Sequence, residues 1–114
     1  EKAQGSMQVR GRDMVTGLPR VVEVPAKEIA VAMSEIIHQI LDAVKDVLEQ
    51  TPPEISADVI DHGIVLTGGG AMLRHLAEMI SKETQVPAFV ANDPLDCVAL
   101  GTGAILANPS LMKK

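Results

Sequence analysis

Aromatic side chains are almost absent from this sequence of 114 residues: Phe89 is the only one, and there is no Trp or Tyr. Proteins that bind single-stranded nucleic acids usually stack the bases on aromatic side chains, so the composition argues against that class. Basic residues are also few, and the formal net charge at pH 7 is −5. Because binding to a phosphate backbone depends on Lys and Arg that displace counterions, no nucleic-acid partner is expected.

Cysteine is also scarce. Cys97 is the only one, so the chain cannot form an intrachain disulfide, and a reducing compartment is favoured. Cys97 and the three histidines, His38, His62 and His75, do not have the spacing of metal ligands, so no metal site is predicted. No base is recognisable beside Cys97 either, which favours a core residue over a nucleophile and leaves no catalytic residue to predict.

Long hydrophobic runs are missing as well. No apolar run reaches 18 residues, so no membrane-spanning helix is expected, and the polar first residues do not have the pattern of a signal peptide. The apolar residues that are present make up 46% of the sequence, and any core must be built from Ile, Val, Leu, Met and Ala. Residues 1–7 contain Gly-Ser-Met and are expected to be a disordered or cloning-derived segment, with the fold in residues 8–114.

A β-hairpin is expected over residues 8–24, because two segments of strand character flank a turn that contains Gly17 and Pro19. A long helix is expected over residues 26–50, where apolar residues recur at steps of three and four until Pro52 and Pro53 end the pattern. One face of this helix is expected to carry Ile29, Met33, Ile36, Ile37, Ile40, Leu41, Val44, Val47 and Leu48.

Shorter elements complete the chain. They are a helix at 53–60, a strand at 64–67, a helix directly after Gly68-Gly69-Gly70, a strand at 86–90 and a last helix at 94–107. Asp93 is expected to cap the last helix, with Pro94 at its first position. The strand–helix–strand order predicts parallel pairing with a right-handed crossover. The fold class is therefore α/β, with a short mixed sheet, a long amphipathic helix and further helices packed on the sheet.

The three glycines between a strand and a helix are the main candidate for a binding site. Glycine permits positive φ and lets another group approach the backbone closely. Free N–H groups at a following helix N-terminus can receive a phosphate or a ribose. The same residues can equally make a tight turn without any ligand. There is no GxxxxGK[ST] and no GxGxxG in the sequence, so neither of the common phosphate loops is present.

A family resemblance favours the first of these interpretations. Residues 64–73, with the sequence IVLTGGGAML, resemble the adenosine motif of the superfamily of actins, heat-shock chaperones and sugar kinases. Residues 9–19, 49–55 and 93–103 are similar to segments of bacterial actins of the MreB/Mbl type. The resemblance runs from about Val9 to the end of the sequence, which is nearly the whole chain.

The resemblance implies an actin-like (ribonuclease H-like) fold in which this chain forms most of one large subdomain. It implies a cytoplasmic protein that binds ATP, as Mg-ATP, and forms filaments at the inner face of the membrane. Those filaments organise sidewall peptidoglycan synthesis with the cell-wall elongation machinery and maintain rod shape. Within the adenosine-motif region, residues 64–83, the matching positions are Gly68, Gly69 and Gly70 for ribose and α-phosphate, and Ala71 and Met72 for the nucleoside, with Met72 near the base.

The same superfamily holds the phosphates between two Gly-rich hairpins and the metal with acidic residues, and no part of these 114 residues matches those elements. Because phosphoryl transfer depends on such positioning and charge stabilisation, the chain alone is expected not to hydrolyse ATP. Its expected partners are the remainder of the same polypeptide and further copies of itself. Two alternatives stay open: a fragment of a sugar kinase of this superfamily, and an interaction module whose glycine turn is purely structural.

Overall fold

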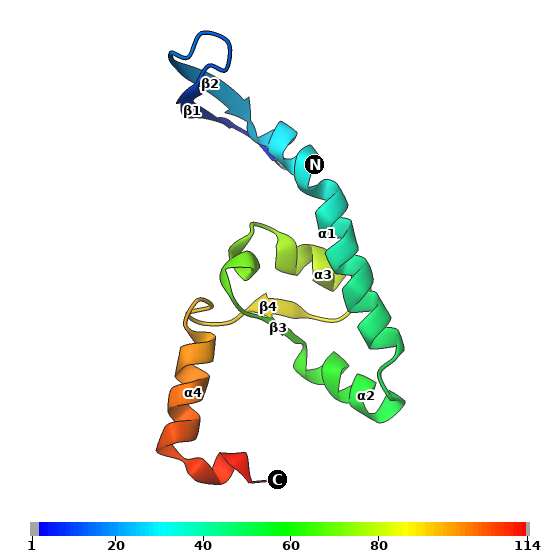
Figure 1. The fold of residues 1–114 in the computed structure, drawn as a ribbon. Helices are drawn as coiled ribbons and strands as arrows, with labels where there is room; N and C mark the ends of the chain where they lie inside the picture. The colour runs from blue at the N-terminus through cyan, green and yellow to red at the C-terminus, as the bar shows by residue number, and fades with distance from the viewer. Residues whose placement is uncertain (1–2, 114) are drawn as a thin grey trace. The chain divides into compact units, whose positions relative to one another are not determined.

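The computed structural model describes residues 3–113, in two compact units that cover residues 1–43 and 44–114. The first unit contains the strands β1 (Ser6–Arg12) and β2 (Pro19–Pro25) and most of the helix α1 (Ala26–Glu49). The second contains α2 (Pro53–His62), β3 (Ile64–Leu66), the 3-10 helix η1 (Gly69–Met72), α3 (Leu76–Thr84) and β4 (Ala88–Val90). It ends with α4 (Cys97–Ala107) and the 3-10 helix η2 (Pro109–Met112) (Figure 1).

The predicted hairpin is present as the antiparallel pair β1–β2, with Ser6 opposite Pro25 and Arg12 opposite Pro19. The strand begins earlier than expected, and the backbone N–H of Ala26 donates to Gly5 O at 2.9 Å just beyond the last pair. Ser6 and Met7 therefore belong to the hairpin rather than to a disordered segment, because their backbone groups face β2. The rest of the predicted segment 1–7 includes residues 1–2, which lie outside the described residues.

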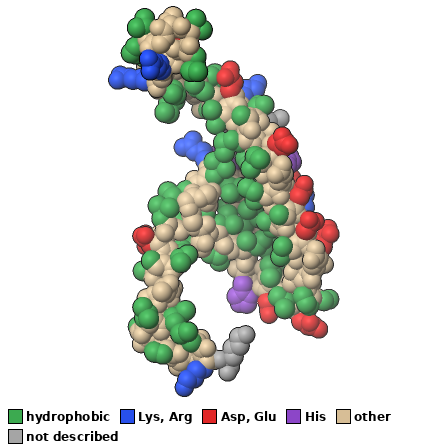
Figure 2. Space-filling view, in the orientation of Figure 1, with side chains coloured by type: hydrophobic (Ala, Val, Ile, Leu, Met, Phe, Trp, Pro, Cys, Tyr) green, Lys and Arg blue, Asp and Glu red, His purple; other side chains and the backbone are tan. Residues whose placement is uncertain are grey.

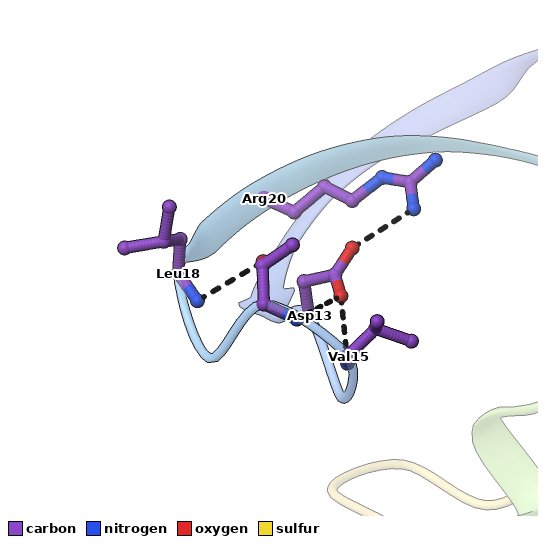
Figure 3. Close-up of polar contacts among 5 residues, drawn as sticks. Asp13, Val15, Leu18 and Arg20 are labelled. Atoms are coloured by element: carbon purple, nitrogen blue, oxygen red, sulfur yellow. Dashed lines mark hydrogen bonds and ion pairs between the residues drawn. The ribbon is translucent and has the colours of Figure 1, made fainter.

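The turn of the hairpin is held by the side chain of Asp13 (Figure 3). Its Oδ1 accepts hydrogen bonds from the backbone N–H groups of Val15 (2.8 Å) and Thr16 (3.0 Å), and its Oδ2 lies 3.2 Å from Arg20 Nη1. The Asp13 backbone N–H donates to Leu18 O at 2.9 Å and closes the loop. The hydrogen bonds from Thr16 and Val15, with that from Arg20, lower the pKa of Asp13 because they stabilise its ionised form.

The long helix α1 forms where the apolar period predicts it, but its apolar residues divide between two adjoining faces. Leu41 is buried, and Met33, Ile37, Val44 and Leu48 are half-buried at steps of three and four from it. The other four residues of the predicted stripe are exposed; these are Ile29, Ile36, Ile40 and Val47. The prediction of a single inward stripe was therefore too broad.

In the second unit, β3 and β4 pair in parallel, with Ile64 opposite Ala88 and Leu66 opposite Val90, so the predicted parallel pairing is confirmed. The predicted short mixed sheet consists of two separate pairs in the described chain, one antiparallel and one parallel. Within the described residues the hairpin strands β1 and β2 pair only with each other.

The small core of the second unit lies where α3 packs against β4. Its buried apolar side chains are Ala71, Leu76, Ile80 and Val86, of which Ile80 is 1% exposed. Gly63 allows β3 to approach the chain before β4, because a Cβ on this residue would lie 2.7 Å from Pro87 O. Its φ of +83° is also one that L side chains rarely adopt.

The last helix begins three residues later than predicted, at Cys97. Asp93 has a φ of +48°, and its carbonyl accepts from the N–H of Asp96 at 2.9 Å, so residues 93–96 form a turn. The predictions that Asp93 caps the helix and that Pro94 is its first residue were therefore wrong. A positive φ directs the chain away from a helical path, and the residue that precedes α4 is Asp96.

Every residue of α4 except the half-buried Cys97 is exposed, although the helix contains no charged side chain. Val98 is 80% exposed and Leu106 is 77% exposed, and hydrophobic side chains are visible along this segment in Figure 2. A helix that is apolar on every side is usually buried. Among residues 3–113, no helix combines the length and the hydropathy needed to cross a bilayer.

Candidate functional site

The three glycines lie at the carboxyl end of β3, as the sequence predicts. Gly68 has a φ of +84°, a conformation that glycine adopts without the steric cost of a side chain. This residue turns the chain out of the strand. Its N–H donates to Pro94 O at 2.7 Å, so the turn is fixed to the loop that follows the neighbouring strand β4. Gly69 and Gly70 then begin η1.

The backbone of this turn faces open space at two of its three glycines. A Cβ added to Gly68 or Gly70 would meet no atom within 4 Å among the described residues. A Cβ added to Gly69 would lie 3.3 Å from Cδ2 of Leu95. The turn is therefore not filled by neighbouring side chains, and a flat group could rest on its bare backbone.

The turn offers two backbone donors to such a group, the N–H groups of Gly69 and Gly70. The amides that follow are already used within the turn: the Ala71 N–H donates to Gly68 O at 3.2 Å, and the Leu73 N–H donates to Gly70 O at 3.1 Å. The N–H groups of Gly69 and Gly70 are the first of η1, and they donate to no backbone carbonyl in the described part of the chain. These two amides can therefore donate to a phosphate or ribose oxygen.

The α-helix predicted directly after the glycines begins later, which changes the electrostatics of the site. Leu73 is extended, with ψ of 123°, and His75 has a φ of +66°, so the helical path is broken between η1 and Leu76. The N-terminus of α3 is therefore separated from the glycines by residues 71–75. The positive end of its dipole is not at the turn, and the donors come from η1 instead.

The two predicted nucleoside-side residues differ in accessibility. Ala71 is 6% exposed and belongs to the core of the unit, so only its backbone faces the turn. Met72 is 60% exposed, and its side chain is available to a ligand. The proximity of Pro94 and Leu95 was missed by the sequence analysis. The available signal was that their loop follows the strand beside β3, since ligands of α/β sheets bind beyond the carboxyl ends of neighbouring strands.

Other chemistry is not assembled in the described residues. Between residues 3 and 113, no cluster of three or more His, Cys, Asp or Glu side chains has the geometry of a metal site. Nδ1 of His38 lies 2.6 Å from Ser34 O, and Nδ1 of His62 lies 2.9 Å from Asp58 O. Cys97 is half-buried with its Sγ 3.5 Å from Asp93 O, so it stabilises the turn before α4.

This arrangement of strand, open glycine turn and short helix can be compared with known proteins. The family model described as "MreB/Mbl protein" matches residues 1–114. The chain belongs to the MreB/Mbl family. The alternative of a sugar kinase is therefore not supported.

Curated relatives agree with this assignment. The chain is 50% identical over 108 residues to the cell shape-determining protein Mbl of Bacillus subtilis (strain 168). The aligned residues cover 95% of this chain and 32% of that protein. It is 46% identical over 100 residues to the cell shape-determining protein MreB of Escherichia coli (strain K12), and the aligned residues cover 88% of this chain and 29% of that protein. The chain thus spans about a third of the length of the relatives it matches.

Solved structures show the same fold. The crystal structure of MreB5 of Spiroplasma citri bound to ADP matches with a TM-score of 0.84 and 34% identity, over 99% of this chain and 34% of that one. The structure of MreB5 from the same organism bound to AMPPNP matches with a TM-score of 0.82 and 35% identity, over 96% of this chain and 32% of that one. The actin-like fold predicted from the resemblance is confirmed for this MreB/Mbl chain.

Proposed function

We propose that this chain is part of an ATP-binding, filament-forming bacterial actin and forms the adenosine side of its nucleotide site. Gly68, Gly69 and Gly70 pass beside the ribose and the α-phosphate, and the amides of Gly69 and Gly70 donate to their oxygens. Met72 lies near the base. The phosphate-binding hairpins and the metal ligands belong to parts of the full-length protein outside these residues, so Mg-ATP is bound only when both parts are present.

The observation that carries this proposal is the open space over Gly68 and Gly70 at the end of β3. A purely structural turn gains stability when side chains pack on it, whereas a ligand site must leave its backbone accessible. Two solved structures that share this fold contain a bound adenine nucleotide, ADP in one and its triphosphate analogue AMPPNP in the other. Both facts support a nucleotide at this turn.

The substitution Gly70→Ala in the full-length protein tests the proposal. An added Cβ at this position meets no protein atom within 4 Å, so the fold should tolerate it, but the methyl group would occupy the space of the ligand. We expect ADP to bind at least about tenfold more weakly, a loss of roughly 1.4 kcal/mol. Isothermal titration calorimetry measures the affinity, and thermal unfolding without nucleotide checks the fold.

The matched control is Gly11→Ala in β1, where an added Cβ also meets no atom within 4 Å. It makes the same chemical change away from the turn and should leave the affinity for ADP unchanged. Unaltered ADP binding by Gly70→Ala would favour the alternative of an interaction module with a purely structural glycine turn.

We further propose that the full-length protein is cytoplasmic and assembles into filaments at the inner face of the membrane. There it organises sidewall peptidoglycan synthesis with the cell-wall elongation machinery and so maintains rod shape. The names of its curated relatives, which are cell shape-determining proteins, support this role. Depletion of the protein in its host should turn rods into spheres, and rods of normal width after depletion would contradict the role.

A further inference from the structure

The loop between β4 and α4 is fixed to the glycine turn along its length. The N–H of Ala91 donates to Leu66 O at 2.9 Å, one step beyond the last pair of the parallel strands. The N–H of Gly68 then donates to Pro94 O at 2.7 Å. These two bonds bring residue 95 beside the turn, although it lies about a quarter of the chain away in sequence from Gly69.

Leu95 approaches the backbone of Gly69 so closely that its Cδ2 would lie 3.3 Å from a Cβ at that position. The side chain nevertheless stays largely in solvent, since Leu95 is 67% exposed. One part of it therefore lies against Gly69, and most of the side chain remains accessible to a ligand. Burial of a leucine in the core cannot explain this position, because the residue buries little of its surface there.

The backbone before Leu95 adopts a conformation that few residues other than glycine accept. Asp93 has a φ of +48°, a region in which most side chains are strained. The Sγ of Cys97 lies 3.5 Å from the carbonyl oxygen of this residue and helps to hold it. This turn directs the carbonyl of Pro94 to Gly68 and the side chain of Leu95 to Gly69.

We propose that Leu95 is a nucleoside-binding residue that supplies an aliphatic surface for the purine base or its ribose. This inference rests on the proposed function, in which a nucleotide lies on the glycine turn. Leu95 lies beside Gly69, and Met72 follows Gly70 by two residues; both side chains are exposed, so apolar surface and the two backbone donors of Gly69 and Gly70 occur in one turn. Small-molecule sites are typically built in this way.

The test is Leu95→Ala in the full-length protein, with titrations of ADP and of inorganic triphosphate, which has no nucleoside. We expect ADP to bind about five- to tenfold more weakly, as removal of roughly 40–50 Å² of apolar contact implies. Binding of triphosphate and thermal unfolding without ligand should be unchanged. Leu95→Met, which restores an aliphatic side chain of similar volume, should bind ADP within about twofold of the original protein.

The matched control is Leu18→Ala, which makes the same change at a residue that is 63% exposed in the hairpin. If ADP binds the original protein and Gly70→Ala weakens it but Leu95→Ala does not, Leu95 has no contact with the nucleoside and the inference is overturned. If Leu95→Ala weakens ADP and triphosphate equally and lowers the unfolding temperature, Leu95 only supports the turn, which also overturns it. Absence of ADP binding to the original protein overturns the proposed function itself.

Discussion

At the scale of single residues, two turns in this chain are specified by different chemistry. Gly68 permits a positive φ that an L side chain would disfavour, and the open backbone that results is the candidate site. Asp13 instead uses a carboxylate, which accepts two backbone hydrogen bonds and pairs with Arg20. The first turn can present a ligand surface because it needs no side chain, whereas the second is stabilised by its own side chain.

Asp13 gives a prediction about pH. The hydrogen bonds from Thr16 and Val15 lower its pKa in the folded hairpin, so the ionised carboxylate stabilises the folded form above the ordinary Asp pKa of about 3.9. This stabilisation is lost as the pH falls through the lowered pKa, because the protonated side chain is a weaker acceptor. NMR titration of the Asp13 carboxyl group should give a midpoint below the ordinary value.

The same residue can be tested by substitution. Asp13→Ala should speed amide hydrogen exchange at Val15 and Thr16, since both amides lose their acceptor. Asp46→Ala, on the exposed surface of α1, is the control and should leave exchange at the hairpin turn unchanged. Equal exchange in Asp13→Ala and in the original chain would show that the carboxylate does not hold the turn.

At the scale of elements, the helices differ in how much of their apolar surface is covered within the described chain. In α3, Leu76 and Ile80 are buried against β4 and its surroundings. In α1, one line of apolar residues is buried or half-buried and a second is exposed. In α4 every residue except Cys97 is exposed. The core of the second unit therefore depends on a few side chains, which come from η1, α3 and the segment before β4.

Ile80 should accordingly be the most sensitive position of α3. Ile80→Ala removes a side chain that is 1% exposed and leaves a cavity, and we expect a loss of about 2–5 kcal/mol in the free energy of unfolding. Lys82→Ala, on the exposed side of the same helix, should cost less than about 0.5 kcal/mol. Denaturant unfolding of the full-length protein measures both, and similar values for the two variants would contradict the assigned core.

At the scale of the whole molecule, this chain spans about a third of the length of its MreB and Mbl relatives, and it exposes much apolar surface. Val98, Leu106 and Met112 in the last two helices are each more than two-thirds exposed. A helix with apolar residues on every side is usually buried, so these exposed side chains indicate contacts with other protein surface. Under the proposed function, the partners that would cover these residues are the remainder of the polypeptide and further copies of it.

The isolated chain should therefore self-associate. Sedimentation velocity over a range of concentrations should show an average mass that rises with concentration, because the apolar residues Val98, Leu100 and Leu106 of α4 are exposed. The isolated chain should also fail to hydrolyse ATP, which a phosphate-release assay measures. A monomer mass that is independent of concentration would contradict the expected self-association. Steady turnover of ATP by the isolated chain would contradict the expected lack of hydrolysis.

The sequence by itself predicted the elements whose signals are local. The hairpin, the long helix and the glycine turn follow from turn residues and from apolar periodicity over a few residues. The parallel pairing of the two short strands follows from the order strand, helix, strand. The segments that resemble bacterial actins also identified the family, because they cover nearly the whole chain.

Only the tertiary structure decided the beginnings of α3 and α4, which face of α1 is covered, and which residues lie beside the glycines. Periodicity did not reveal the breaks at His75 and Asp93, since each depends on a positive φ that the surrounding structure maintains. It also could not bring Pro94 and Leu95 to Gly68 and Gly69. That proximity arises when two strands pair in parallel and place their carboxyl ends together, which is a property of the folded chain and not of any short segment.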